Sequence, residues 1–118
     1  MSQVKIKRQF RVISSVSVTT ATGTATTLRL EDMAGAVMQL PTITTNAATI
    51  NVWGNTTDTG TFAQLYGSDG SAASITLAPS TTNQTMYALP DAAYAAPFIK
   101  LVAANTNATA TVSVVMKS

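Results

Sequence analysis

The chain has 118 residues, with seven Lys and Arg, five Asp and Glu, and neither His nor Cys. Without these two residue types it has no disulfide, no thiolate metal site and no imidazole or thiol for catalysis. Its length fits one compact domain over residues 1–118, and its 46% hydrophobic content is enough for one core. We therefore expect a protein that is not an enzyme.

The basic residues are concentrated at the N-terminus. Five of the seven precede residue 30, whereas Lys100 and Lys117 are the two that follow the first acid, Glu31. A basic strip of this kind is typical of a segment that docks on an acidic protein surface. The alternative interpretation is that it forms a solvated strand face. It contains too few interleaved aromatic residues for a nucleic-acid site, so we expect no nucleic-acid partner. The five early bases are Lys5, Lys7, Arg8, Arg11 and Arg29.

The first segment alternates between apolar and polar residues, which predicts a long strand over residues 4–19 with one buried face. Arg8 and Ser14 interrupt the apolar side and Ile13 interrupts the polar side. This break at 13–15 predicts a β-bulge, or two strands joined end to end. The residues expected to be buried are Val4, Ile6, Phe10, Val12, Val16 and Val18.

Further short strands follow in chain order. After a turn around Gly23 we expect strands near 28–30, 37–43, 46–53 and 61–66, with Pro41 marking a strand end or an edge position. The Gly-Ser-Asp-Gly sequence at 67–70 predicts a tight turn. Strands near 75–77, 85–89, 98–103 and 109–116 complete the chain, and the Ala-rich loop at 90–97 has room for one helical turn.

Eight or nine short strands with frequent turn signals and no long helix predict an all-β protein. The fold class that we expect is an antiparallel β-sandwich, jelly-roll-like, with an extended N-terminal strand, and a barrel is the alternative. No apolar run reaches the roughly 18 residues that a membrane span needs, so we expect no membrane partner.

The acidic residues do not form a catalytic pair. Glu31 and Asp32 are adjacent, and Asp58, Asp69 and Asp91 lie in separate predicted turns, where Asp commonly caps backbone groups. A Ca²⁺ site built from Asp58, Asp69 and loop carbonyls is the alternative interpretation. We expect no cofactor, no metal and no small-molecule substrate.

The few aromatic residues have two interpretations. Trp53, Tyr66 and Tyr94, beside Asn and Asp residues, could form an exposed platform on which sugar rings stack. Alternatively, Trp53 belongs with Phe62 and Phe98 in the core or at an interface, because a core with so few aromatic residues needs them.

Residues 46–117 show a pattern that resembles a known class of proteins. A strand ends at Trp53-Gly54, and T-G-T-F-A-Q-L-Y follows at 59–66. Next come G-S-D-G at 67–70, I-T-L at 75–77 and Y-A-L-P at 87–90. F-I-K-L-V at 98–102 and a final T-V-S-V-V-M-K strand complete it. The pattern is similar to that of small β-sandwich virion proteins of tailed bacteriophages, of the capsid decoration or cement type.

The resemblance implies a non-enzymatic protein on the outside of a phage head that bridges and stabilises neighbouring capsomers. Its implied partners are the major capsid protein and copies of itself, as a trimer before a dimer. We expect synthesis in the host cytoplasm, because no apolar signal segment follows the early bases. The alternative is a carbohydrate- or receptor-binding module of a tail or fibre. The residues expected to contact the capsid or other copies are Lys5, Lys7, Arg8, Phe10 and Arg11.

Overall fold

The computed structural model describes residues 9–41, 49–78, 83–104 and 110–118, which contain nine strands and one short 3₁₀ helix. The alternating segments of the sequence account for the strands, and the Ala-rich loop forms the single helical turn. In chain order these are β1 (Phe10–Val18), β2 (Thr27–Arg29), β3 (Gly35–Leu40), β4 (Thr49–Asn55), β5 (Ala63–Gln64), β6 (Ser74–Thr76), β7 (Thr85–Ala88), η1 (Asp91–Ala95), β8 (Phe98–Ala103) and β9 (Ala110–Lys117).

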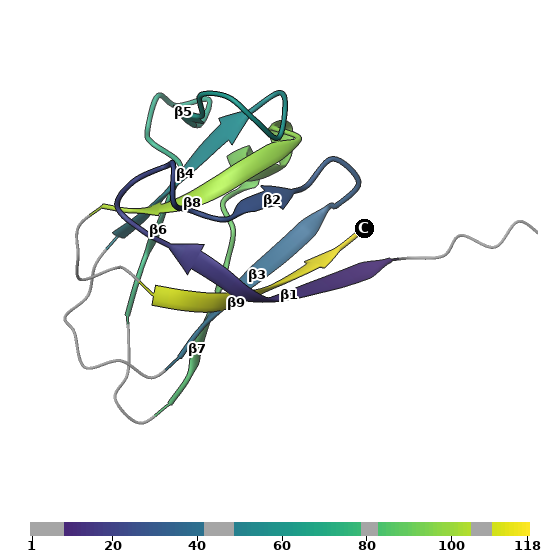
Figure 1. Cartoon of the computed structure of the whole chain (residues 1–118), viewed down its shortest axis with the longest axis vertical. Helices are drawn as coiled ribbons and strands as arrows, with labels where there is room; N and C mark the ends of the chain where they lie inside the picture. Colours follow the sequence, from purple (N-terminus) through teal and green to yellow (C-terminus); the bar gives the residue numbers. More distant parts are fainter. Residues whose placement is uncertain (1–8, 42–48, 79–82, 105–109) are drawn as a thin grey trace, which may run out of the picture.

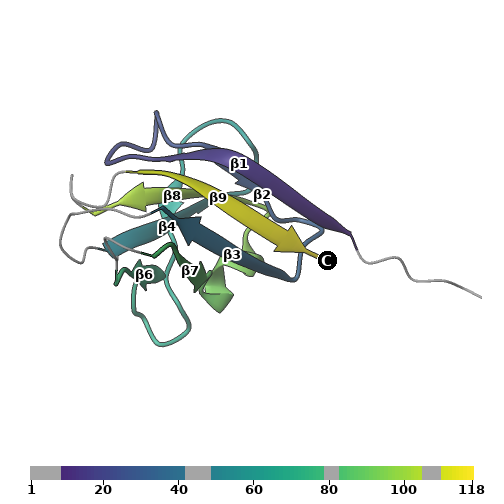
Figure 2. The ribbon, with the colours of Figure 1, turned by 90° about the horizontal axis from the view of Figure 1, so that it is seen from below.

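The strands form two antiparallel sheets packed face to face, as predicted for a β-sandwich (Figure 1). Sheet A has the order β1-β9-β3-β7, and Figure 2 shows these four strands side by side with β1 along one edge. Sheet B has the order β2-β8-β4-β5, and β6 also pairs with β4. The first and last of the described strands, β1 and β9, pair with each other in this sheet. The jelly-roll-like connection of the strands stays a prediction.

The core lies between the sheets and consists almost entirely of aliphatic side chains. In β3, β4 and β9 every second residue is buried, because successive side chains of a strand point to opposite faces. Both sheets contribute to one cluster, so burial of this apolar surface holds the two layers together. Its fully buried members include Val16, Val18, Leu28, Leu30, Met38, Leu40, Ile50, Val52, Leu77, Ile99, Leu101 and Met116.

Two of the three aromatic residues expected in the core are not there. Trp53 and Phe98 are half-buried, whereas their chain neighbours Val52 and Ile99 are fully buried. Alternation along β4 and β8 therefore places both rings on the outer face of sheet B. Phe62 is buried, but it lies under the ammonium of Lys100, 4.6 Å from the ring centroid, and outside the central cluster.

The predicted break in the first strand is a genuine shift in register. Ile13 pairs with Val114 and Val16 with Val112, so three steps along β1 match two steps along β9. One extra residue is therefore inserted in β1, which confirms the predicted bulge. Because side chains alternate with a period of two, the insertion exchanges the faces of the residues on its two sides.

A glycine in β4 allows the sheet to pack closely against the segment after η1. A Cβ atom added at Gly54 would lie 2.9 Å from Cβ of Ala96, closer than real Cβ atoms approach, and 3.2 Å from Leu65. We expect Gly54→Ala to lower the free energy of unfolding by about 1–3 kcal/mol through overpacking. Gly23→Ala is the matched control, because no atom lies within 4 Å of its added Cβ. Denaturant unfolding of both variants tests this, and equal stabilities would contradict it.

Candidate functional site

The N-terminal half of β1 carries the most exposed large apolar side chains of this strand. Phe10 is 70% exposed and Val12 is 52% exposed, whereas Val16 and Val18 beyond the bulge are buried. The predicted buried face is confirmed for Val16 and Val18 and wrong for Phe10 and Val12, because the bulge turns the first half of the strand over. Val4 and Ile6, predicted for the same face, lie outside the described residues. Ile13, expected on the polar side, instead packs against the core.

Along one edge, the backbone of the same residues has no partner among the described parts of the chain. The Ser118 amide donates to the carbonyl of Gln9 (2.9 Å), and the Gln9 amide donates to Oγ of Ser118 (2.8 Å), so the polar groups of Gln9 point toward the chain end that follows β9. Because this orientation alternates in an antiparallel pair, the N–H and C=O groups of Phe10 and Val12 point away from β9. We call this segment, residues 10–13, the β1 edge.

Beyond the bulge the edge is closed. The Thr26 amide donates to the carbonyl of Ser17 (3.2 Å), and the Ser17 amide donates to Oγ1 of Thr26 (2.9 Å). The segment leading into β2 therefore covers the second half of β1. The β1 edge is accordingly short, and residues 1–8, which come before it in the sequence, are outside the described part of the chain.

Arg11 points the other way and takes part in a cluster of ion pairs. Its guanidinium lies 3.4 Å from the carboxylate of Asp32 and donates to the carbonyl of Arg29 (3.1 Å). Arg29 in turn contacts Glu31 (3.3 Å) and Asp32 (3.6 Å). These groups are one-third to one-half exposed, so each pair contributes little stability in water. Their consequence is that the charge of Arg11 is already matched within the chain.

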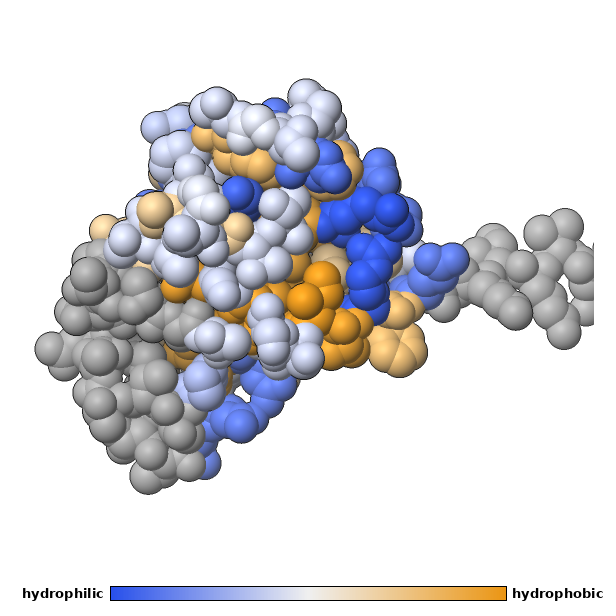
Figure 3. All heavy atoms as spheres, viewed as in Figure 1, coloured by the Kyte–Doolittle hydropathy of each residue, from blue (hydrophilic) through white to orange (hydrophobic). Residues whose placement is uncertain are grey.

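An apolar row continues from the β1 edge across the outer face of sheet A. Val12 pairs with Val115, Val115 with Val37, and Val37 with Ala88. Directly paired residues of antiparallel strands share a face, so these four side chains form one row across all four strands. Figure 3 shows apolar surface over β1 next to strongly hydrophilic surface at the end of the molecule where β1 begins.

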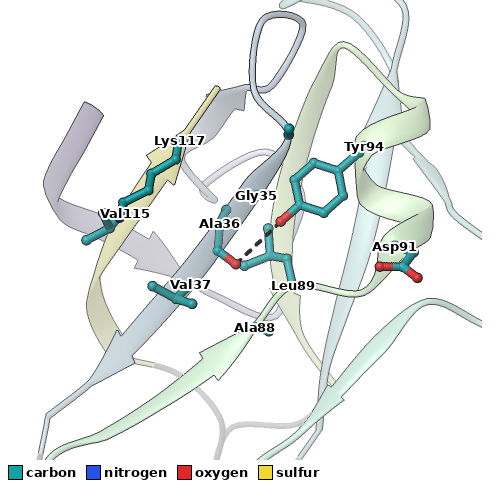
Figure 4. A pocket seen from close by; sticks show the side chains of 10 residues that line it. Gly35, Ala36, Val37, Ala88, Leu89, Asp91, Tyr94, Val115 and Lys117 are labelled. Atoms are coloured by element: carbon teal, nitrogen blue, oxygen red, sulfur yellow. Dashed lines mark hydrogen bonds between the residues drawn. The ribbon is translucent and has the colours of Figure 1, made fainter. Parts of the chain in front are cut away.

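The row leads into a hollow of about 460 Å³ at the far side of the sheet (Figure 4). Val37, Val115 and Ala88 lie on one side of it, and Tyr94 and Asp91 of η1 on the other. The Tyr94 hydroxyl donates to the carbonyl of Ala36 (3.4 Å), and partial burial raises the pKa of Tyr94 above its ordinary value. This tyrosine therefore braces η1 against β3 and has its hydroxyl occupied.

The residues predicted to bind a capsid or another copy have different outcomes. Lys5, Lys7 and Arg8 lie outside the described residues. Phe10 is exposed on the β1 edge, where a partner can reach it, whereas Arg11 is bound to Asp32.

The three aromatic residues proposed as one sugar platform are not brought together. Trp53 lies on the outer face of sheet B, paired with Lys100 and Gln64, and its indole nitrogen is buried without a partner among the described residues. Tyr94 lines the hollow beside sheet A. Tyr66 is 62% exposed and lines a different hollow. The three rings therefore do not line one hollow, and Tyr66 is the exposed one of the three.

The sequence contained a signal for the apolar row that the strand predictions did not use. Val115 interrupts the alternation of Val112, Val114 and Met116, and Val37 stands beside Met38 in the same way. Each extra valine is an apolar residue on a face expected to be polar. The ion pair between Arg11 and Asp32 had no such signal, because it depends on how the two sheets meet.

The described residues contain no group of three or more acidic side chains that could hold a metal ion. They also include no helix that is long and apolar enough to cross a membrane. Comparison with known proteins found no matching family model, no matching curated protein and no matching solved structure.

Two identical substitutions on either side of the bulge test the orientation of β1. Val16→Ala removes buried methyl groups and should lower the free energy of unfolding by about 2 kcal/mol. Val12→Ala removes methyl groups that are already half in water, so a change of about 0.5 kcal/mol or less is expected. Denaturant unfolding gives both values. Equal losses at the two positions would show that Val12 is buried as Val16 is.

Proposed function

We propose that this chain is a non-enzymatic virion structural protein of the capsid decoration type. In this proposal it binds the outside of a phage head through the β1 edge and stabilises neighbouring capsomers. The observation that carries the proposal is the combination of unpaired backbone with the exposed side chains of Phe10 and Val12. The capsid as partner comes from the resemblance of residues 46–117 to proteins of that class.

An unpaired edge of this kind suits strand addition, in which an extended segment of a partner pairs with the sheet. Main-chain hydrogen bonds then supply affinity, and alternate side chains supply specificity. The apolar row begins at Val12, so a partner that pairs with β1 can also cover Val115 and Val37. One contact of this kind would therefore provide hydrogen-bond partners for the backbone of the β1 edge and also bury apolar surface.

Charge gives the contact a preferred partner. Arg11 is matched by Asp32, whereas Lys117 of β9 lies directly opposite Phe10 at the β1 edge. The sequence that precedes the edge contains three more bases, Lys5, Lys7 and Arg8. These bases would steer the chain to an acidic surface and raise the rate of association. An acidic region of the major capsid protein is therefore the proposed target.

The chemical groups of the chain support a structural role over a catalytic one. The sequence has no His or Cys, and Glu31 and Asp32 are bound to arginines. Asp69 stabilises its turn by accepting from the Ser71 amide, as expected for Asp at such a position. Asp91 is the first residue of η1, which has no side-chain capping hydrogen bond. We further propose self-association on the capsid, as a trimer before a dimer, on the basis of the resemblance.

Two substitutions at one position test docking through the β1 edge. Val12→Pro removes an N–H that none of the nine described strands uses, so the fold should tolerate it while strand addition is blocked. Val12→Thr keeps both the N–H and a β-branched side chain and serves as the matched control. Purified protein is mixed with heads of the encoding phage that lack it, and binding is measured by co-sedimentation.

We expect the wild type and Val12→Thr to sediment with the heads and Val12→Pro to remain in solution, with all three folded by circular dichroism. Wild-type protein that never binds heads would contradict the decoration role itself. Binding of Val12→Pro equal to the wild type would contradict only the use of the β1 edge.

A further inference from the structure

A second hollow, of about 700 Å³, lies between the turn after β5 and η1 and is lined by no residue of the β1 edge, although Asp91 of η1 also lines the hollow beside sheet A. The turn supplies an exposed aromatic ring, hydroxyl groups and a carboxylate, and η1 supplies small apolar residues and a second carboxylate. We call it the turn hollow. Its lining includes Tyr66, Ser68, Asp69, Ser71 and Ser74 on one side and Pro90, Asp91, Ala92 and Ala95 on the other.

The wall formed by the turn is braced by hydrogen bonds. The Gly67 amide donates to the carbonyl of Ser71 (2.8 Å), and the Gly70 amide donates to that of Gly67 (3.0 Å). Gly70 has φ +84°, which a side chain would disfavour. Behind the turn, Nε2 of Gln64 donates to the carbonyls of Val52 (3.0 Å) and Leu65 (2.8 Å). A wall held in this way loses little conformational freedom when a ligand binds.

Tyr66 is the unusual member of this wall. Its backbone is fixed by a bridge to Ala72, yet its side chain is 62% exposed. The ring makes no side-chain hydrogen bond within the described part of the chain, and it is not among the residues that pack on the core. An aromatic ring held by its backbone and left uncovered offers a flat apolar surface with a polar tip, which suits a ligand that is apolar on one face and polar at its rim.

The charges of the turn hollow restrict the ligand further. Its two charged residues, Asp69 and Asp91, are both acids, so an anionic ligand such as a phosphate or a sialic acid would be repelled. Oδ1 of Asp69 accepts from the Ser71 amide (3.0 Å), and the carboxylate has further lone pairs that can accept from a ligand. The same contact lowers the pKa of Asp69, so this carboxyl is an ionised acceptor at neutral pH. Two carboxylates beside an aromatic ring suit a neutral ligand that donates hydroxyl protons.

We propose that the turn hollow binds a neutral saccharide unit, a hexose or N-acetylhexosamine, whose C–H face packs on Tyr66 while its hydroxyls donate to Asp69 and Asp91. Ca²⁺ is the competing occupant, but it requires six to eight oxygen ligands, and the aromatic ring supplies none. The site shares no residue with the β1 edge, so it stands whether or not the chain decorates a capsid.

The test uses the full-length chain labelled with ¹⁵N, titrated separately with glucose, galactose, mannose, N-acetylglucosamine and N-acetylgalactosamine. At least one sugar should shift the amides of residues 66–74 and 91–95 in a saturable manner. Tyr66→Ala should weaken that binding about tenfold or more, whereas Tyr66→Phe should retain it, because the ring face carries the contact. Asp91→Ala should weaken binding severalfold, and Asp58→Ala, which removes an acid outside the hollow, should not.

Three results would overturn the proposal. The first is that none of the five sugars shifts these amides, including the case in which CaCl₂ alone shifts them. The second is equal affinity of wild type and Tyr66→Ala, with the spectrum outside the hollow showing that the variant is folded. The third is binding of N-acetylneuraminic acid as strong as that of the neutral sugars, since the two carboxylates should exclude an anion.

Discussion

The pairing of β1 with β9 across a one-residue bulge is the constraint on which the rest of the account depends. Beyond the bulge, Val16 and Val18 complete the core and fix β1 to sheet A. Before it, the same strand must present Phe10 and Val12 to solvent, because side chains alternate with a period of two. Because of one inserted residue, one half of β1 packs in the core and the other half presents apolar side chains at the surface.

The two sheets otherwise form a conventional aliphatic core that places few demands on individual residues. Val, Leu, Ile and Met fill the space between the layers, and the aromatic side chains are left mostly outside it. Trp53 and Phe98 cover the outer face of sheet B, Tyr94 braces η1, and Tyr66 remains exposed. Because aliphatic residues fill the core, most aromatic side chains lie at the surface, and one of them, Tyr66, lines the turn hollow.

The sequence predicted the strands well because their alternation is local. The bounds of the strand at 98–103, the end of β3 before Pro41 and the Gly67–Gly70 turn all agree with the structure. The bulge around Ser14 could also be predicted from the sequence. The exposure of Phe10 could not, because the sequence does not show which half of the strand buries its apolar side chains in the core. The ion pair between Arg11 and Asp32 and the hollow between the turn and η1 are each formed by segments that are distant in the sequence. A local sequence pattern cannot predict contacts of this kind.

Hydrogen exchange of individual amides in the isolated chain tests the central claim most directly. The Arg11 N–H lies in the ladder with β9, and the N–H groups of Phe10 and Val12 lie on the open side of the strand. Exchange should therefore be slow at Arg11 and fast at Phe10 and Val12, within one continuous strand. Slow exchange at Phe10 and Val12, equal to that at Arg11, would contradict the open edge and with it the proposed docking surface.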